Sequence, residues 1–180
     1  GSTQQSIEQL LKIKALTPNS SRRVPAQFDA VILLMQIKDW PAAITELKEL
    51  NTKFPEHELA ADFPRKLASA HEHNGDWVEA AAAYMYLAGN DADAEIKREA
   101  LFLAASMYEN AKNIPKAIET YKKYAREFEE PFDTRMEARH KIALNYGVIK
   151  DEGKQQYWLR RIIEGNRKAG AKRTERSVWL

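Results

Sequence analysis

Two histidines flank a glutamate at His71, Glu72 and His73, and these side chain types could bind a metal ion. Zinc-binding helices, however, use histidines four positions apart, because side chains two positions apart point in different directions. We therefore expect His71 to pack inside the protein and His73 to line its surface.

Three alternating acidic residues, Asp91, Asp93 and Glu95, could begin a calcium-binding loop. Such a loop also needs a glycine at its sixth position and a glutamate at its twelfth, and both are missing here. The three acidic residues instead favour capping of the following helix and interaction with its dipole.

Motifs for catalysis are absent from the sequence. It contains no phosphate-binding loop, no dinucleotide-binding glycine pattern, no nucleophile elbow and no H-E-x-x-H zinc motif. Carboxylates are plentiful, but no two can be placed together in an apolar cleft as a general acid and base. The sequence predicts no enzyme activity, no metal site and no cofactor.

Basic residues gather near the C-terminal end of the sequence. Between residues 160 and 176, two acidic residues, Glu164 and Glu175, accompany seven basic ones: Arg160, Arg161, Arg167, Lys168, Lys172, Arg173 and Arg176. This cluster could contact nucleic acid, acidic lipid headgroups or an acidic protein. Only Trp158 and Trp179 supply flanking aromatic rings for single-strand stacking, so a solvated helix end is the favoured alternative.

The composition limits the class of protein. The chain has 180 residues and a net charge of +2. It contains no cysteine, and this absence excludes disulfide scaffolds and thiolate chemistry. No apolar run approaches the roughly 18 residues of a membrane span. Few glycines and prolines, together with many Ala, Leu, Glu and Lys residues, predict an all-α fold. Residues 1–2 are interpreted as an expression scar.

The helical pattern repeats along the chain. One series contains Asp39, Trp40, Ala43, Ile44, Leu47, Leu50 and Pro55; a second, 37 positions later, contains Gly75, Asp76, Trp77, Ala80, Ala81, Tyr84 and Leu87; a third, after another 37, contains Asn113, Ile114, Ala117, Ile118, Tyr121 and Tyr124. Such a period is typical of an α-solenoid. The recurring Ala43, Ala80 and Ala117 are expected where two helices cross closely.

This spacing resembles the tetratricopeptide repeat family. The family's pattern of a small residue at position 8, Ala at 20 and a bulky residue at 24 matches Asn74-Gly75-Asp76-Trp77 with Ala80 and Tyr84. The chain departs from this pattern at Val31, which takes a small-residue position, and at Gln155, which takes the Ala position. The longer period is similar to that of bacterial cell-envelope members of the family. The resemblance implies an α-solenoid of antiparallel helix pairs that forms a right-handed superhelix.

The pattern divides the chain into repeats, predicted at residues 24–58, 61–92, 95–131 and 134–166, with the second helix of a truncated repeat at 3–20 and the start of a further one at 167–180. Helices are expected at residues 4–15, 25–37, 41–53, 63–74, 78–88, 93–111, 115–128, 134–148 and 153–164, and a final one from Thr174. Gly89 and Gly165 are predicted helix stops, and Thr134 with Glu137 a capping box.

In this family the first helix of each repeat lines a concave groove, and the resemblance implies which side chains face it. The candidate partner-binding residues are Phe28, Arg65, Ser69, Glu72, His73, Phe102, Ser106, Glu109, Asn110, Glu137 and His140; Ile32, Met35 and Leu144 hold equivalent positions. For Phe28, Ile32 and Met35, burial against the preceding helix pair is the favoured alternative. Because Phe28 and Ile32 replace the Lys and Asn of the family's carboxylate clamp, we do not expect binding of chaperone tails.

The ends of the chain lack the polar caps of a complete solenoid. We expect an internal piece of a longer repeat protein, whose ends expose apolar surface and support self-association. The predicted function is a non-enzymatic scaffold segment that binds a protein or peptide partner in its groove. One alternative is the docking or regulatory arm of an enzyme, and another is nucleic-acid binding through the basic cluster, which we consider less favoured. The resemblance favours a bacterial periplasm or cell envelope over the cytoplasm.

Overall fold

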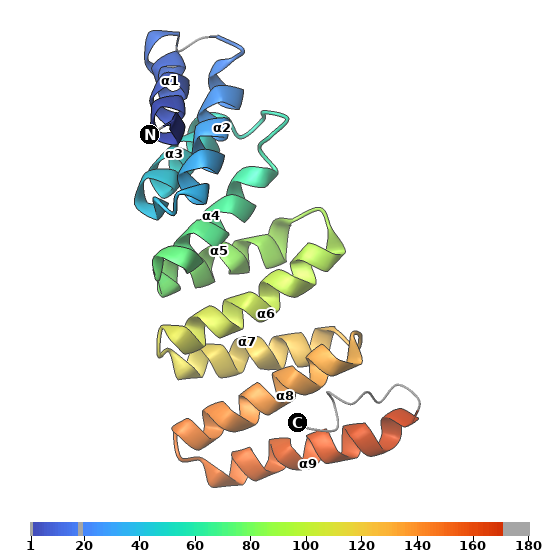
Figure 1. The fold of residues 1–180 in the computed structure, drawn as a ribbon. Coiled ribbons are helices and arrows are strands. Elements are labelled where there is room, and N and C mark those ends of the chain that lie inside the picture. The colour runs from blue at the N-terminus through green and yellow to red at the C-terminus, as the bar shows by residue number, and fades with distance from the viewer. Residues whose placement is uncertain (1, 18–19, 171–180) are drawn as a thin grey trace. The chain divides into compact units, whose positions relative to one another are not determined.

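The computed structural model describes residues 2–17 and 20–170 of the chain. Within these residues every regular element is a helix (Figure 1), which confirms the predicted all-α class. The helices are α1 (Ser2–Leu16), α2 (Arg23–Gln36), α3 (Trp40–Lys53), α4 (Asp62–Asn74), α5 (Trp77–Asn90), α6 (Ala94–Asn110), α7 (Ile114–Glu127), α8 (Phe132–Val148) and α9 (Glu152–Ala169).

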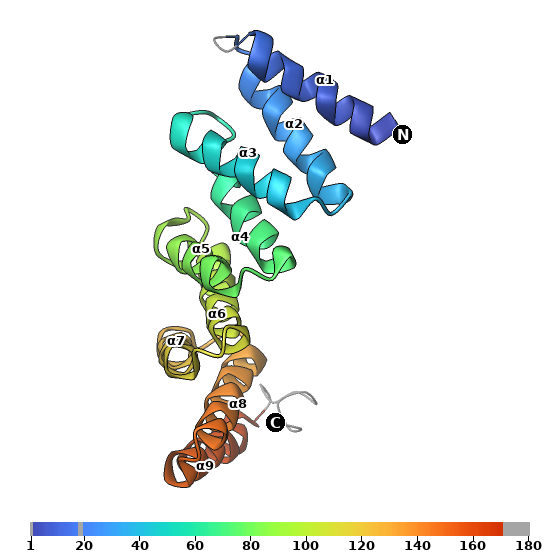
Figure 2. The same cartoon turned by 90° about the vertical axis from the view of Figure 1, so that its left-hand side faces the viewer.

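The chain forms two compact units, residues 1–83 and 84–180, and the boundary between them in the sequence falls within α5. In the first unit α1 packs on α2, α2 on α3 and α3 on α4. In the second unit α6 packs on α7, α7 on α8 and α8 on α9, so that these four helices pack on one another in the order of the sequence (Figures 1 and 2). Contacts of this kind characterise an α-solenoid of antiparallel helix pairs.

Each unit has its own apolar core. The core of the first unit is built around buried side chains that include Val31, Leu47 and Phe63, and the core of the second around Leu101, Tyr121 and Ile142. The recurring alanines Ala43, Ala80 and Ala117 are fully buried, which agrees with their expected place at close helix crossings.

The turns inside the helix pairs repeat in backbone conformation. Lys38, Gly75, Lys112 and Lys150 all have positive φ angles, of 62°, 80°, 60° and 59°. The residue after each lysine caps the next helix: Asp39 accepts a hydrogen bond from the backbone N–H of Ala42, Asn113 from that of Lys116 and Asp151 from that of Lys154. The repeat, with intervals of 37, 37 and 38 residues between these turns, is therefore visible in the backbone as well as in the side chains.

Three sequence-based expectations about helix ends are wrong. Helix α5 continues past Gly89 to Asn90, and α9 continues past Gly165 to Ala169. Thr134 does not cap α8, because that helix begins at Phe132, whose N–H donates to the Glu130 side chain at 2.9 Å. By contrast, Asp93 caps α6 as expected, accepting hydrogen bonds from the N–H groups of Glu95 and Ile96.

The helix expected from Thr174 lies outside the described residues, as do residues 171–180 of the predicted further repeat. Part of the predicted basic cluster, comprising Lys172, Arg173, Glu175 and Arg176, also lies there.

Candidate functional site

A cavity of about 490 Å³ lies against α6 and α8 in the second unit. It is lined by Glu95, Arg98, Glu99, Phe102, Leu103, Tyr124, Pro131, Thr134 and Glu137. Two of these residues, Phe102 and Glu137, are among the candidate partner-binding residues, and the fold brings them to one site although they stand 35 positions apart in the sequence.

Aromatic rings form the apolar part of this cavity. The Phe102 ring lies edge-on to Tyr121 and to Tyr124, with 5.3 Å between ring centroids in both pairs. Tyr121 and Tyr124 are themselves buried, so Phe102 packs against two fixed side chains. Phe102 itself is half-buried, so part of its surface is accessible. Aromatic side chains held in this way are typical anchors of protein–protein interfaces.

Carboxylates dominate the charge of the cavity. Three glutamates, Glu95, Glu99 and Glu137, line it together with a single cation, Arg98. Arg98 lies 3.3 Å from the Glu95 carboxylate and pairs with it. Burial raises the pKa of the Tyr124 hydroxyl, which therefore stays neutral at physiological pH. The site combines excess negative charge with a neutral aromatic surface.

Glu109, also on α6, has a structural role. Its carboxylate accepts hydrogen bonds from the Tyr121 hydroxyl at 3.2 Å, from Lys141 at 3.1 Å and from Asn145 at 3.1 Å. These contacts link α6 to α7 and α8. Burial, and next the nearby Glu109 charge, raise the pKa of Tyr121, so its hydroxyl remains a donor. Glu109 thus helps to hold the predicted binding face together.

The other candidates in the second unit flank this network. Ser106 hydrogen-bonds the Tyr121 side chain, Asn110 is exposed at the end of α6, and His140 is half-buried on α8. The predicted set in this unit therefore lies on α6 and α8, with the cavity beside Phe102.

In the first unit, four candidates lie on α4: Arg65, Ser69, Glu72 and His73. Arg65 lies 3.9 Å from Asp62. The His73 ring donates to the backbone carbonyl of Ser69 at 2.8 Å and contacts the Trp40 ring, with 4.8 Å between centroids. These contacts leave His73 exposed, as expected from the sequence.

The last candidate of the first unit, Phe28, is half-buried on α2. Its ring contacts Phe63 at 5.4 Å between centroids, and both Phe28 and Met35 pack against the core. Ile32 is also half-buried. Packing therefore occupies much of the surface of this apolar group.

His71 is buried, with 4% of its surface exposed, and its Nδ1 atom lies 2.9 Å from the Asp76 carboxylate. The neighbouring His73 points to a different environment, as the helical geometry predicts. In the described residues, no group of three His, Cys, Asp or Glu side chains has a geometry that could hold a metal ion.

Sequence reasoning missed several residues of the α6–α8 cavity. Glu95, Arg98, Glu99 and Tyr124 were not among the candidates, nor was Thr134 as a lining residue. Tyr124 belongs to the repeat pattern as a buried position, and nothing in that pattern signals that its side chain borders a cavity. The spacing of Glu95, Glu99 and Phe102 along one helical face was the available signal.

The described part of the basic cluster is spread along α9. Arg160, Arg161, Arg167 and Lys168 are exposed there. Among the residues that the structure describes, none of the helices combines the length and apolar character needed to cross a bilayer.

Comparison with known proteins agrees with this architecture. Residues 99–130 match the model of the tetratricopeptide repeat family. No curated protein matches the chain.

Solved structures of similar fold cover almost the whole chain. A crystal structure titled "Podosopora anserina putative kinesin light chain nearly identical TPR-like repeats" is 17% identical, with a TM-score of 0.61 over 96% of this chain and 90% of that one. A crystal structure of MamA protein is 19% identical, with a TM-score of 0.61 over 95% of this chain and 86% of that one. Residues 99–130 therefore form a tetratricopeptide repeat, and the chain has the fold of tetratricopeptide-repeat proteins.

Proposed function

We propose that this chain is a non-enzymatic scaffold segment that holds a partner polypeptide across α6 and α8. The observation that carries the proposal is the cavity in which Phe102 and Tyr124 lie beside Glu95, Glu99 and Glu137. The tetratricopeptide-like fold supports the proposal, because stacked helix pairs present extended surfaces that suit polypeptides.

The chemistry of the cavity favours a cationic anchor on the partner. A lysine or arginine side chain has an apolar stem that can lie along Phe102 and a charged end that can reach the carboxylates. The three glutamates and one arginine leave a formal charge of −2 around the cavity. Like-charge repulsion would disfavour an acidic segment at the same position.

Fluorescence anisotropy with two defined peptides tests the preference for a cation. The first is a labelled 12-residue peptide of alternating lysine and leucine, and the second replaces each lysine with glutamate. We expect the lysine peptide to bind and the glutamate peptide not to bind. Phe102→Ala should weaken binding about tenfold or more, because truncation of a central interface anchor removes about 2 kcal/mol or more. Equal binding of both peptides would contradict the charge assignment.

Matched variants separate the cavity from general surface charge. Glu99→Gln with Glu137→Gln should weaken binding of the lysine peptide, whereas Glu127→Gln, on α7 and outside the cavity, should leave it unchanged. Far-UV circular dichroism should show full helicity in each variant. If Glu127→Gln weakens binding as much as the cavity variants, the interaction is non-specific.

Cross-linking identifies the natural partner. A photoreactive amino acid at Glu99, in the full-length protein within its native cells, should yield a covalent adduct with a polypeptide that carries a basic segment at the attachment point. The same amino acid at Glu127 serves as the control. Identical adducts at the two positions would argue against binding across α6 and α8.

The predicted residues of α4 extend the proposal to the first unit. Arg65→Ala should weaken partner binding without loss of helicity if the partner also contacts that helix. An unchanged affinity would confine the binding surface to α6 and α8.

A further inference from the structure

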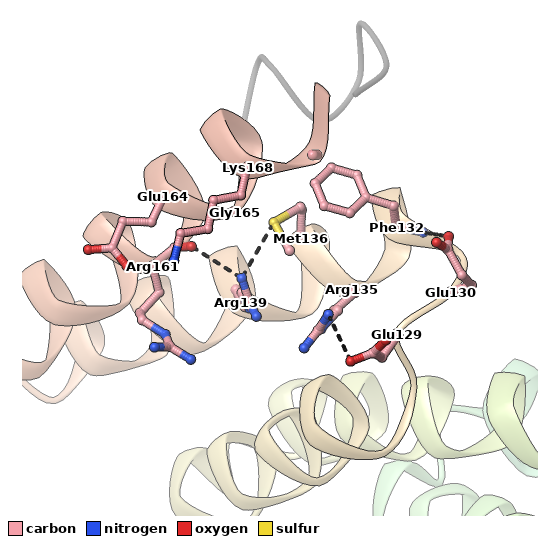
Figure 3. Close-up of a pocket in the computed structure, with 11 residues that line it drawn as sticks. Glu129, Glu130, Phe132, Arg135, Met136, Arg139, Arg161, Glu164, Gly165 and Lys168 are labelled. Atoms are coloured by element: carbon pink, nitrogen blue, oxygen red, sulfur yellow. Dashed lines mark hydrogen bonds and ion pairs between the residues drawn. The ribbon is translucent and has the colours of Figure 1, made fainter. Parts of the chain in front are cut away.

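A second cavity, of about 280 Å³, lies between the N-terminal half of α8 and the C-terminal half of α9 (Figure 3). It is distinct from the cavity beside Phe102, and two of its basic residues, Arg161 and Lys168, belong to the basic cluster identified in the sequence between residues 160 and 176. Four cationic side chains line it: Arg135 and Arg139 from α8, and Arg161 and Lys168 from α9. The arginines of α8 are four positions apart, so they lie on the same helical face.

Arg139 occupies the centre of this group and is buried, with 8% of its surface exposed. Its Nη1 atom donates to the backbone carbonyl of Arg161 at 3.2 Å and approaches the Met136 Sδ atom at 3.8 Å (Figure 3). Both acceptors are uncharged. Within the described part of the chain, no carboxylate lies within 4 Å of the Arg139 guanidinium. A buried cation without an anion is unfavourable unless an anion from elsewhere reaches it.

The neighbouring charges increase this demand for an anion. Figure 3 shows the guanidinium groups of Arg161 and Arg135 on either side of Arg139. The positive charges of these two groups repel the positive charge of Arg139. Burial, followed by the charges of Arg135 and Arg161, lowers the pKa of Arg139 to about 10. The side chain therefore still carries its proton at neutral pH.

The absence of a side chain at Gly165 makes room for this arrangement. A Cβ atom at Gly165 would lie 2.9 Å from Arg139 Nη1 and 3.0 Å from Met136 Sδ, which is too close for either atom to stay in place. This glycine, in the C-terminal half of α9, therefore allows Arg139 to reach the carbonyl of Arg161. This close approach explains why Gly165 occurs inside a helix, where glycine is otherwise unfavourable.

We propose that this cavity binds a carboxylate of an acidic peptide, with Arg139 at its centre and Arg135 and Arg161 at its sides. The guanidinium group matches the geometry of a carboxylate, because its N–H donors form parallel pairs of hydrogen bonds with two oxygens. This site lies outside the α6–α8 surface and does not depend on the function proposed for that surface.

The charge around the cavity favours a carboxylate over a phosphate. Three glutamates, Glu129, Glu130 and Glu164, also line it, which leaves a formal charge of +1 against the four cations. A single carboxylate would neutralise that charge. A phosphate close to its dianionic form would add repulsion from the glutamates.

Nuclear magnetic resonance of the full chain with ¹⁵N-labelled arginine tests the proposal. The probe is the blocked peptide Ac-Ala-Ala-Glu-Ala-Ala-NH₂, and its glutamine counterpart is the neutral control. We expect a saturable shift of the Arg139 Nε–Hε signal with the glutamate peptide only. The absence of a saturable shift, or equal shifts with both peptides, would overturn the proposal.

Three variants connect the shift to the cavity. Arg139→Gln should weaken binding about tenfold or more, because a hydrogen bond to a charged group contributes about 1.5–3 kcal/mol. Gly165→Ala should keep the fold, since alanine suits a helix better than glycine, and should weaken binding because the new methyl group displaces Arg139. Arg126→Gln, whose side chain is 75% exposed on α7, is the matched control and should bind normally.

The same measurements decide between ligand classes. Inorganic phosphate and a ten-nucleotide single-stranded DNA are titrated under identical salt conditions. Tighter binding of either one through the Arg139 signal would overturn the carboxylate assignment. If Arg139→Gln loses helicity, Gly165→Ala and Arg161→Gln remain as the deciding variants, and normal binding by both would also overturn the proposal.

Discussion

Gly147 on α8 lies directly against Gln155 on α9: a Cβ atom at Gly147 would be only 2.6 Å from the Nε2 atom of Gln155. Gln155 stands where alanine recurs in the other repeats. The small residue that a close helix crossing needs is thus supplied by the first helix of this pair instead of the second. The repeat at residues 134–166 therefore keeps its close helix packing, because the small residue lies on α8 and the large residue on α9.

This relationship predicts strong coupling between the two positions. Gly147→Ala alone should stabilise the helix by about 1 kcal/mol through helix propensity, but the new methyl group forces the Gln155 side chain to move. We therefore expect a thermal midpoint lower than helix propensity alone predicts. With Gln155→Ala in the same chain, Gly147→Ala should become stabilising. A double-mutant cycle from urea unfolding measures the coupling. Additive effects of the two changes would show that the contact has no energetic importance.

The left-handed turns make a second prediction. Lys38 has a φ angle of 62°, a conformation that costs a residue with a Cβ atom about 1–2 kcal/mol. Lys38→Gly should raise the free energy of unfolding by up to about 1 kcal/mol, after the greater chain entropy of glycine is subtracted. Gly75→Ala, at the equivalent turn, should lower it.

Lys48→Gly provides the control for that comparison. Lys48 is an exposed residue inside α3, where glycine should destabilise the protein by about 1 kcal/mol. Thermal unfolding of the variants should therefore move in opposite directions for the two lysines. A decrease for both would mean that the turn is not strained.

A third prediction concerns pH. The Glu49 carboxylate pairs with Lys14, with Arg23 at 2.9 Å and with Lys53 at 2.9 Å. Burial by itself raises the pKa of Glu49, but the hydrogen bonds from Lys14 and Lys53 outweigh it and lower the pKa from 4.5 to about 2. The stability that this group contributes is fully present above pH 4.5 and is lost as the pH falls towards 2.

Urea unfolding of the chain and of Glu49→Gln measures this contribution. At pH 6 the unmodified chain should be more stable than the variant, and the difference should shrink steadily between pH 4.5 and pH 2. Glu56→Gln, at an exposed position, should show no such pH-dependent difference. A constant gap between the chain and Glu49→Gln across this range would contradict the assignment.

The repeat architecture could be predicted because its signals are local. The apolar spacing, the alanines at the crossings and the capping residue Asp93 depend on neighbours within a few positions of the chain. Even the left-handed turns carry a partial signal, since Gly75 marks one of them. Lys112 and Lys150 adopt the same left-handed conformation, but lysine at a position does not predict a positive φ angle.

The candidate sites depended on contacts between distant positions. The family pattern named Phe102, Glu109 and Glu137, but it could not show that Glu109 bonds to Tyr121 and Asn145. Nor could it show that Tyr124 borders a cavity. These outcomes follow from how the side chains of three helices meet.

The sequence by itself determined the helices, their period and the residues that pack between them, because these follow from periodic burial along the chain. Only the tertiary structure decided that Gly147 accommodates Gln155 and that Gly165 accommodates Arg139. The physical reason is the same in both cases. The space open to a side chain at a helix crossing depends on the residue of the opposite helix, and no local pattern specifies which residue that is.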